Sequence, residues 1–179
     1  MAVIPDGAAA RSRRVRWAMT AIVIAVVAAD QVTKSLVAAG AFADGSSFGP
    51  VTVDVVRNHG AATGIASGFP LLVTLAALAI SGLAAALALR APSRTAAICL
   101  AAVLGGAIGN LSDRLFRSPG FGRGGVVDWI HLTLGGNGSM DVADLAIQFG
   151  VLGAVGAMLV AGLLRARRRQ PSPEQPEPR

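Results

Sequence analysis

The sequence predicts an all-α membrane protein of four transmembrane helices with a small β element outside the membrane. Of its 179 residues, 53% are hydrophobic and 15% are charged, and the mean hydropathy is +0.59. A helix needs about 20 apolar residues to cross a bilayer. Four apolar blocks reach that length, at about residues 17–37, 69–89, 95–115 and 144–164. We therefore expect one membrane domain over residues 15–165, a basic cytoplasmic tail at 1–14, and a disordered cytoplasmic tail rich in Pro and Glu at 166–179.

The connection between the first two blocks is polar and contains VTVDVV. Val51, Val53 and Val55 alternate with Thr52 and Asp54, and a period of two is typical of a strand. A small β element is predicted here, at about residues 45–62. The glycine-rich stretches SPGFGRGG and TLGGNGSM are predicted to be loops on the same side of the membrane.

Arginines gather on one side of the predicted bundle. They precede the first block, flank the turn between the second and third, and follow the fourth: Arg11, Arg13, Arg14, Arg16, Arg90, Arg94, Arg165, Arg167, Arg168 and Arg169. With four spans these three regions share one side, and the positive-inside rule makes it the cytoplasm. Both termini are predicted to be cytoplasmic. Because this placement explains the net charge of +6, the charge does not indicate nucleic-acid binding.

An alternative interpretation makes residues 11–29 a cleaved signal peptide, because a basic stretch and an apolar run end in Val27-Ala28-Ala29. Cleavage would leave an odd number of spans and disturb the charge asymmetry. These two consequences favour the uncleaved chain.

Aspartates interrupt the apolar sequence at several points, among them Asp30, Asp113, Asp128 and Asp144. An ionised carboxylate costs about 2.5–3.5 kcal/mol at a helix centre on insertion scales, so several at one membrane level indicate a function. Asp128 and Asp144 are both predicted near the outer surface. If they meet they share a proton, and one can act as base and the other as acid toward a water, as in aspartic peptidases. The alternative for Asp144 is helix capping, for which Asp141 competes.

Other polar side chains lie at helical spacing near these acids. Asp30 and Lys34 are four residues apart and can pair, either as a support for a site or as a snorkelling ion pair at the interface. In the third apolar block, Gly106, Asn110 and Asp113 lie on one face of the predicted helix, and Arg114 follows them. Facing lipid would be costly for these polar groups, so this face is predicted to look into the bundle. Helix–helix hydrogen bonding is the alternative role for Asn110.

The sequence lacks the residues that several other kinds of catalytic or metal site require. His59 and His131 are solitary, so a zinc peptidase is not indicated, and the sequence has neither G-x-S-x-G nor a P-loop. The single cysteine, Cys99, excludes an intramolecular disulfide and a cysteine-cluster metal site.

The motifs DQVTK, RNHGAATG, GAIGNLSDR, GVVDWI and DVADLAI, in this order on a four-span chain, resemble the lipoprotein signal peptidases (signal peptidase II) over about residues 15–165. The resemblance implies a membrane aspartic peptidase of the bacterial cytoplasmic membrane, with membrane lipids around it. It would cut prolipoproteins just before a diacylglyceryl-modified cysteine, need no metal or organic cofactor, and be blocked by globomycin-type inhibitors. It implies Asp128 and Asp144 as the catalytic pair and an outer β-cradle around VTVDVV. The implied supporting residues are Asp30, Lys34, Asn58, Gly60, Asn110, Asp113 and Arg114.

The chain departs from the family pattern at two positions. Asp141 stands where the family usually has Asn, three residues before the second catalytic aspartate. A third carboxylate there would raise a pKa of the pair, or it could point away as a cap. Thr63 stands where the family often has an aromatic residue in the cradle loop, which bears on substrate contacts.

The residues alone leave two other classes open. One is a small proton- or ion-coupled transporter that relays ions through buried aspartates. Such a transporter would want acids near the bilayer midplane, whereas these cluster toward one end. The other is a non-catalytic membrane scaffold held together by polar contacts.

Overall fold

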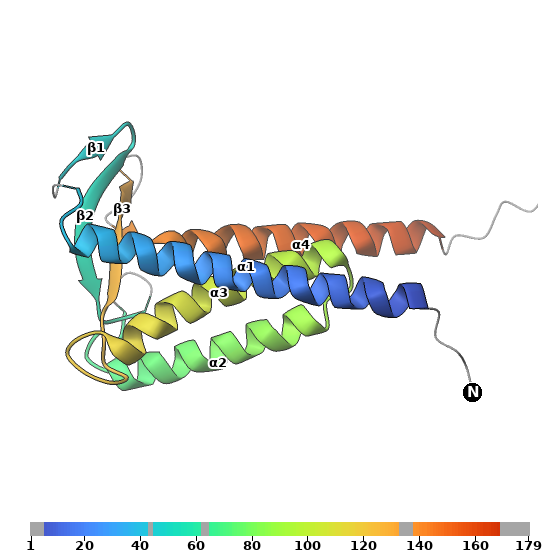
Figure 1. Cartoon of the computed structure of the whole chain (residues 1–179), viewed down its shortest axis with the longest axis horizontal. Coiled ribbons are helices and arrows are strands. Elements are labelled where there is room, and N and C mark those ends of the chain that lie inside the picture. The colour runs from blue at the N-terminus through green and yellow to red at the C-terminus, as the bar shows by residue number, and fades with distance from the viewer. Residues whose placement is uncertain (1–5, 43–44, 62–64, 133–137, 169–179) are drawn as a thin grey trace, which may run out of the picture.

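The computed structural model describes residues 6–42, 45–61, 65–132 and 138–168. Within these residues four long helices lie side by side, and a small sheet covers one end of the bundle (Figure 1). The helices are α1 (Asp6–Ala38), α2 (Pro70–Leu89), α3 (Arg94–Phe116) and α4 (Val142–Arg168). All four are long and apolar enough to cross a membrane. The predicted class, a four-helix membrane protein with a small β element, is confirmed.

Helix α3 lies at the centre of the bundle and contacts each of the other three helices. In the most apolar stretch of α3, 56% of the residues are buried, whereas the share is 11–28% in the corresponding stretches of the other helices. The outer helices instead expose large apolar side chains, such as Leu75, Leu83, Leu152 and Leu159. A surface of this kind suits lipid rather than water.

The helices extend beyond the predicted blocks. Because α1 begins at Asp6, residues 6–14 of the expected basic tail are helical. Ala and Arg dominate this stretch, and both are strong helix formers. Helix α1 also runs unbroken through residues 11–29, the segment of the signal-peptide alternative. At the other end, residues 166–168 belong to α4, and residues 169–179 lie outside the described part.

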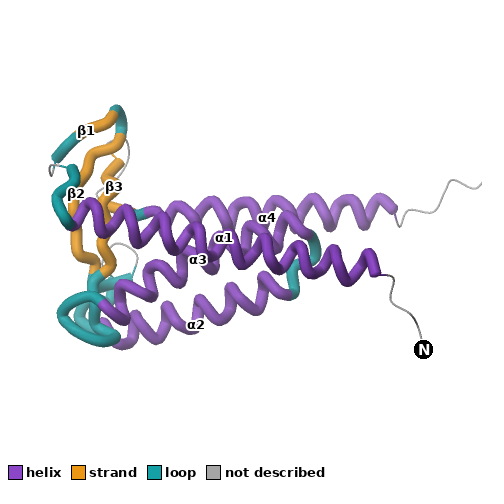
Figure 2. The backbone as a smooth tube through the Cα atoms, in the orientation of Figure 1, coloured by secondary structure: helices purple, strands orange, loops and turns teal. Residues whose placement is uncertain are grey.

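The sheet has four antiparallel strands in the order β1-β2-β3-β4. Strands β1 (Ser47–Phe48) and β2 (Val51–Asn58) come from the predicted β element. Strands β3 (Val126–Leu132) and β4 (Ser139–Met140) come from the connection between α3 and α4 (Figure 2). This second pair is not predicted from the sequence. Most of β3 is buried, so it reads as a continuous apolar run without the alternation of a half-exposed strand.

One extra residue in β2 decides which face Asn58 occupies. Val53 pairs with Ile130 but Val56 pairs with Asp128, so β2 takes three steps where β3 takes two. Alternate residues of a strand share a face, and a bulge of this kind exchanges the faces beyond it. Asn58 therefore lies on the same face as Asp128, instead of the opposite one.

Candidate active site

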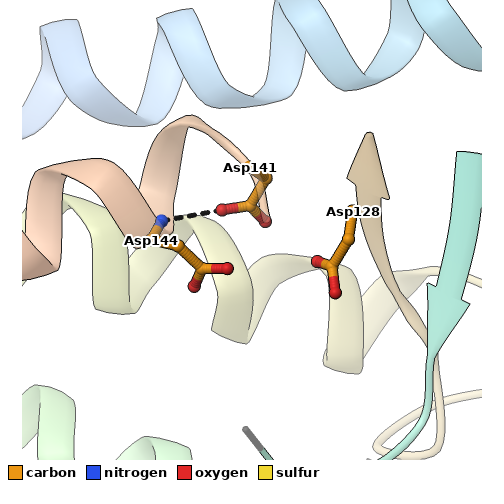
Figure 3. Close-up of side chains that lie close together, drawn as sticks. All are labelled: Asp128, Asp141 and Asp144. Atoms are coloured by element: carbon orange, nitrogen blue, oxygen red, sulfur yellow. Dashed lines mark hydrogen bonds between the residues drawn. The ribbon is translucent and has the colours of Figure 1, made fainter. Parts of the chain in front are cut away.

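Asp128 and Asp144 meet at the end of the bundle that the sheet covers (Figure 3). Asp128 comes from β3 and is 4% exposed, and the half-buried Asp144 comes from the first turn of α4. Carboxylate oxygens of Asp128, Asp141 and Asp144 all lie within 4.8 Å of one another. Figure 3 shows the carboxyl groups of Asp128 and Asp144 pointing toward each other. Since like charges at this range resist joint ionisation, the pair is suited to holding one proton between its members.

Asp141 caps α4, which leaves the carboxyl group of Asp144 available. Its Oδ1 accepts a hydrogen bond from the backbone N–H of Asp144 at 2.7 Å, the arrangement of an N-cap (Figure 3). The N–H of Ala143 donates to Oδ1 of Asp30 at 3.1 Å. Two of the N–H groups that a helix start leaves without partners are therefore satisfied by other side chains. Capping is the role of Asp141, not of Asp144.

Lys34, the only lysine of the chain, lies at the centre of a buried charge cluster next to the pair. Its Nζ is 2.8 Å from Asp30, 2.9 Å from Asp113 and 2.7 Å from Asp141, and it donates to Oδ1 of Asn110 at 3.0 Å. Lys34 and the three aspartates are all 0% exposed. The Asp30–Lys34 pair is thus an internal ion pair, not one that snorkels to the interface. Through Asp141 the cluster fixes the start of α4.

Each member of the Asp128–Asp144 pair is held by an asparagine. Nδ2 of Asn58 donates to Oδ2 of Asp128 at 3.2 Å, and Nδ2 of Asn110 donates to Oδ1 of Asp144 at 2.9 Å. An amide donor fixes the orientation of a carboxylate and favours its ionised form. The predicted inward face of α3 therefore reaches the pair through Asn110.

Arg114 holds the loop that carries Asn58. Its Nη2 donates to the backbone carbonyl of Gly60 at 2.7 Å, and the N–H of Gly60 donates to Oδ1 of Asn58 at 3.0 Å. Arg114 is 7% exposed and lines the same cleft as the pair. Thr63, in the continuation of this loop, lies outside the described residues.

Asp113 anchors β3 and is not itself part of the pair. Its Oδ2 accepts a hydrogen bond from the N–H of Val127 at 3.2 Å, directly before Asp128. Its Oδ1 accepts from Gln31 and Arg117. Neither donor is among the predicted site residues, although Arg117 follows Asp113 by four residues, the spacing of a helical ion pair.

Two glycines let α3 approach the neighbouring helices closely. A Cβ added at Gly106 would collide with the backbone carbonyl of Ala143 in α4. One added at Gly109 would lie 2.6 Å from Oδ2 of Asp30 in α1. The predicted site residue Gly106 thus acts by its lack of a side chain, because that brings Asn110 and Asp144 within bonding distance.

Two acids of the site that lie outside the membrane-spanning helices, Asp128 and Asp141, have raised pKa values. Burial raises the pKa of Asp128 to about 6, and the negative charge of Asp144 adds to the rise. Burial also raises the pKa of Asp141 to about 7, where the charges of Asp144 and Asp30 add to the rise and Lys34 opposes it. Carboxyl groups with such pKa values can both donate and accept protons at neutral pH.

A cleft of about 570 Å³ opens beside the pair. Its polar wall includes Asn58, Asn110, Arg114, Asp128 and Asp144, and much of its apolar wall is Leu72, Val73, Ala76, Ile80 and Ile147. Such a cleft can take a chain that is apolar along its length and polar at the point facing the acids.

Asp128, Asp141 and Asp144 could also offer three oxygens to a divalent cation. However, Asp141 is already engaged by Lys34 and by the N–H of Asp144. The geometry therefore favours acid–base chemistry by Asp128 and Asp144.

Comparisons with known proteins point to one family and one fold. The family model described as signal peptidase (SPase) II matches residues 22–160. A lipoprotein signal peptidase of Bifidobacterium adolescentis is 36% identical over 143 residues, which cover 78% of this chain and 73% of that protein. One of Leifsonia xyli is 36% identical over 137 residues, but the match covers 72% of this chain and only 62% of that relative's length, less than two thirds. A solved structure of a bacterial membrane enzyme shares the fold, with a TM-score of 0.66 at 24% identity, covering 88% of this chain and 94% of that one.

Proposed function

The chain belongs to the signal peptidase II family, and we propose that it is a membrane aspartic endopeptidase that removes signal peptides from prolipoproteins. The observation that carries the proposal is the meeting of Asp128 and Asp144 beside one cleft. The proposed substrate carries diacylglycerol on the cysteine that follows the scissile bond. Its lipid chains would lie in the bilayer beside the helices, and its peptide would enter the cleft.

In the proposed reaction a water lies between the two carboxyl groups. The ionised aspartate takes a proton from this water while the water oxygen attacks the scissile carbonyl carbon, and the protonated aspartate donates a hydrogen bond to the carbonyl oxygen. The tetrahedral intermediate then collapses as the C–N bond breaks and a proton passes to the leaving nitrogen. The pKa of Asp128, about 6, suits a group that holds this shared proton. The reaction as written uses no metal or organic cofactor.

The remaining predicted site residues are proposed to position the pair. Asn58 and Asn110 orient the two carboxyl groups by direct hydrogen bonds. Arg114 and Gly60 hold Asn58, whereas Asp113 holds β3. Asp30, Lys34 and Asp141 hold the start of α4, and Gly106 permits the approach of α3.

We further propose a place in the bacterial cytoplasmic membrane with both termini in the cytoplasm and the active site near the outer face. The arginines support it: those at positions 13, 14, 16, 90, 94, 165 and 167 lie toward helix ends opposite the sheet. The alternative of a small ion-coupled transporter is not supported. The acids gather next to the sheet at one end of the bundle, and the comparisons point to peptidases.

The direct test is incubation of the purified protein with a diacylglyceryl-modified prolipoprotein, with and without globomycin. We expect release of the signal peptide in its absence and no release in its presence. Proton flux into liposomes without any cleavage would instead favour the transporter.

The catalytic assignment is tested by Asp128→Asn and Asp144→Asn. Each should lower kcat by about 10²- to 10⁴-fold, because each removes one partner of the acid–base pair. Asp54→Asn is the matched control, since Asp54 is an exposed aspartate on β2, and it should cleave at the parent rate. Near-normal turnover by either variant of the pair would overturn the assignment.

A further inference from the structure

A second, larger cleft lies at the end of the bundle opposite the sheet. It has a volume of about 1010 Å³ and opens between α1 and the turn that joins α2 to α3. Figure 1 shows the N-terminal part of α1 extending past this turn. The cleft shares no lining residue with the one beside Asp128 and Asp144. It is therefore separate from the cleft of the candidate active site.

The walls of this cleft are of two kinds. One part is apolar and includes Val15 and Met19 of α1 and Leu89 at the end of α2. The other part is polar and consists of Arg16, Arg94, Ser12 and Ser93, which we call the rim. Because Ser93 is the N-cap of the 23-residue helix α3, the partial positive charge of that helix end also faces the rim.

Among the described side chains, no acidic group neutralises this positive charge. Arg16 and Arg94 are exposed, and neither forms an ion pair in the part of the chain that the structure describes. The sequence has no Asp or Glu between Asp6, at the start of α1, and Asp30, and none in residues 55–112 or 145–173. An anion from solution or from the membrane could therefore bind at the rim and balance the charge of the two arginines.

We propose that this cleft binds an anionic phospholipid. The phosphate would lie among Arg16, Arg94 and the start of α3, and an acyl chain would run along Met19 and Leu89. The positive-inside rule accounts for arginines on this side of the membrane, but not for two of them on the rim of an apolar cleft. A free anion would satisfy the rim and leave the apolar wall uncovered. A zwitterionic lipid would cover the apolar wall, but it would leave the positive charge of the rim without a net negative charge to balance it.

The bound lipid would also join two helices that scarcely touch. Within the described residues, helix α3 packs extensively against both α1 and α2, whereas α1 and α2 pack on each other far less. Met19 lies against the small core cluster of Ala88, Leu100 and Ala154 next to the cleft. A lipid there would fill the space between the cytoplasmic ends of α1 and α2 under the proposed topology. The proposal depends on that topology but not on the peptidase activity.

The test is lipid binding by the purified, delipidated full chain, measured by native mass spectrometry. Phosphatidylglycerol should bind about tenfold more tightly than phosphatidylcholine with the same acyl chains. Arg16→Gln/Arg94→Gln should remove most of that preference. The matched control is Arg165→Gln/Arg167→Gln, which removes the same charge from the same end but lies outside the cleft, and it should keep the preference.

Three results would overturn the proposal. Equal loss of preference in the two double variants would mean diffuse attraction of anions to the surface. Equal affinity for the two lipids would mean no headgroup site, and displacement of phosphatidylglycerol by inorganic phosphate alone would mean an anion site without a lipid. Arg16→Lys/Arg94→Lys separates charge from folding: it should retain the preference, and all variants should unfold at the parent temperature without lipid.

Discussion

Asp141 places a third acid in a site whose proposed chemistry needs two. Around the pair the structure gathers five aspartates but only three cations: Asp30, Asp113, Asp128, Asp141 and Asp144 against Lys34, Arg114 and Arg117. Full ionisation would leave a net negative charge in a largely buried site. Protons must therefore be retained near neutral pH, and Asp141, with a pKa of about 7, is one group that can hold them.

Asp141→Asn should change the pH dependence of cleavage. Above pH 7 the parent carries a negative charge at Asp141. Because Asp141 lies close to both members of the pair, this charge should make it harder for the pair to lose its shared proton. Removing that charge should lower the pKa values of the pair, so the alkaline limb of the kcat profile moves to lower pH. Asp54→Asn, the exposed control, should not move it. Superimposable profiles for Asp141→Asn and the parent would show that Asp141 does not couple to the pair.

Lys34→Met should destabilise the fold strongly. It would leave Asp30, Asp113 and Asp141 buried without their shared cation, and breaking a buried ion pair costs about 3–5 kcal/mol. Arg123→Met, which removes one charge from an exposed position, should change the free energy of unfolding little. Unfolding in detergent measures both variants. Adding Asp141→Asn to Lys34→Met should recover part of the lost free energy of unfolding. If it does not, the destabilisation does not come from the unpaired carboxylate of Asp141.

At the scale of the elements, the contact between α3 and α4 decides whether the pair forms. Gly106→Ala should separate these helices, because the added methyl group would collide with the carbonyl of Ala143 and move Asp144 away from Asn110. Gly82→Ala is the matched control: it makes the same change inside α2, where nothing lies within 4 Å of the added Cβ. Since alanine is the better helix former, Gly82→Ala should be neutral or slightly stabilising. Gly106→Ala should lower both cleavage and the unfolding temperature, and equal behaviour of the two variants would contradict this account.

The helices could be predicted from the sequence and half of the sheet could not. Span length and the position of charge depend on local composition, so the four helices follow from it directly. Strand β3 is not recognised as a strand because its sequence is a continuous apolar run. The hydrogen bond from Asn58 to Asp128 depends on a bulge in β2, and no local sequence pattern indicates that bulge. The spacing of residues 128 and 144 along the chain likewise does not say that they meet. The resemblance to a family, not periodicity, supplied the pair.

At the scale of the whole molecule, charge divides along the bundle axis. The aspartates of the site gather beside the sheet, and most of the arginines in the described residues lie near the helix ends opposite the sheet. The anionic pair would face substrates arriving from outside, and the cationic end would face the anionic lipid surface inside. A single orientation satisfies both ends, so orientation in the membrane is a direct test of the proposal.

The orientation can be measured with single cysteines in a Cys99→Ala background, since Cys99 is the only native cysteine. Ser118→Cys lies in the exposed connection after α3 on the sheet side, and Ala166→Cys lies in the exposed last turns of α4. A membrane-impermeant maleimide should label Ser118→Cys on intact cells and Ala166→Cys only after the membrane is opened. The reverse pattern would put the acid pair on the cytoplasmic side, where a peptidase for exported prolipoproteins would not meet its scissile bond. Retained cleavage by both labelled variants would show that the engineered chains keep the native fold.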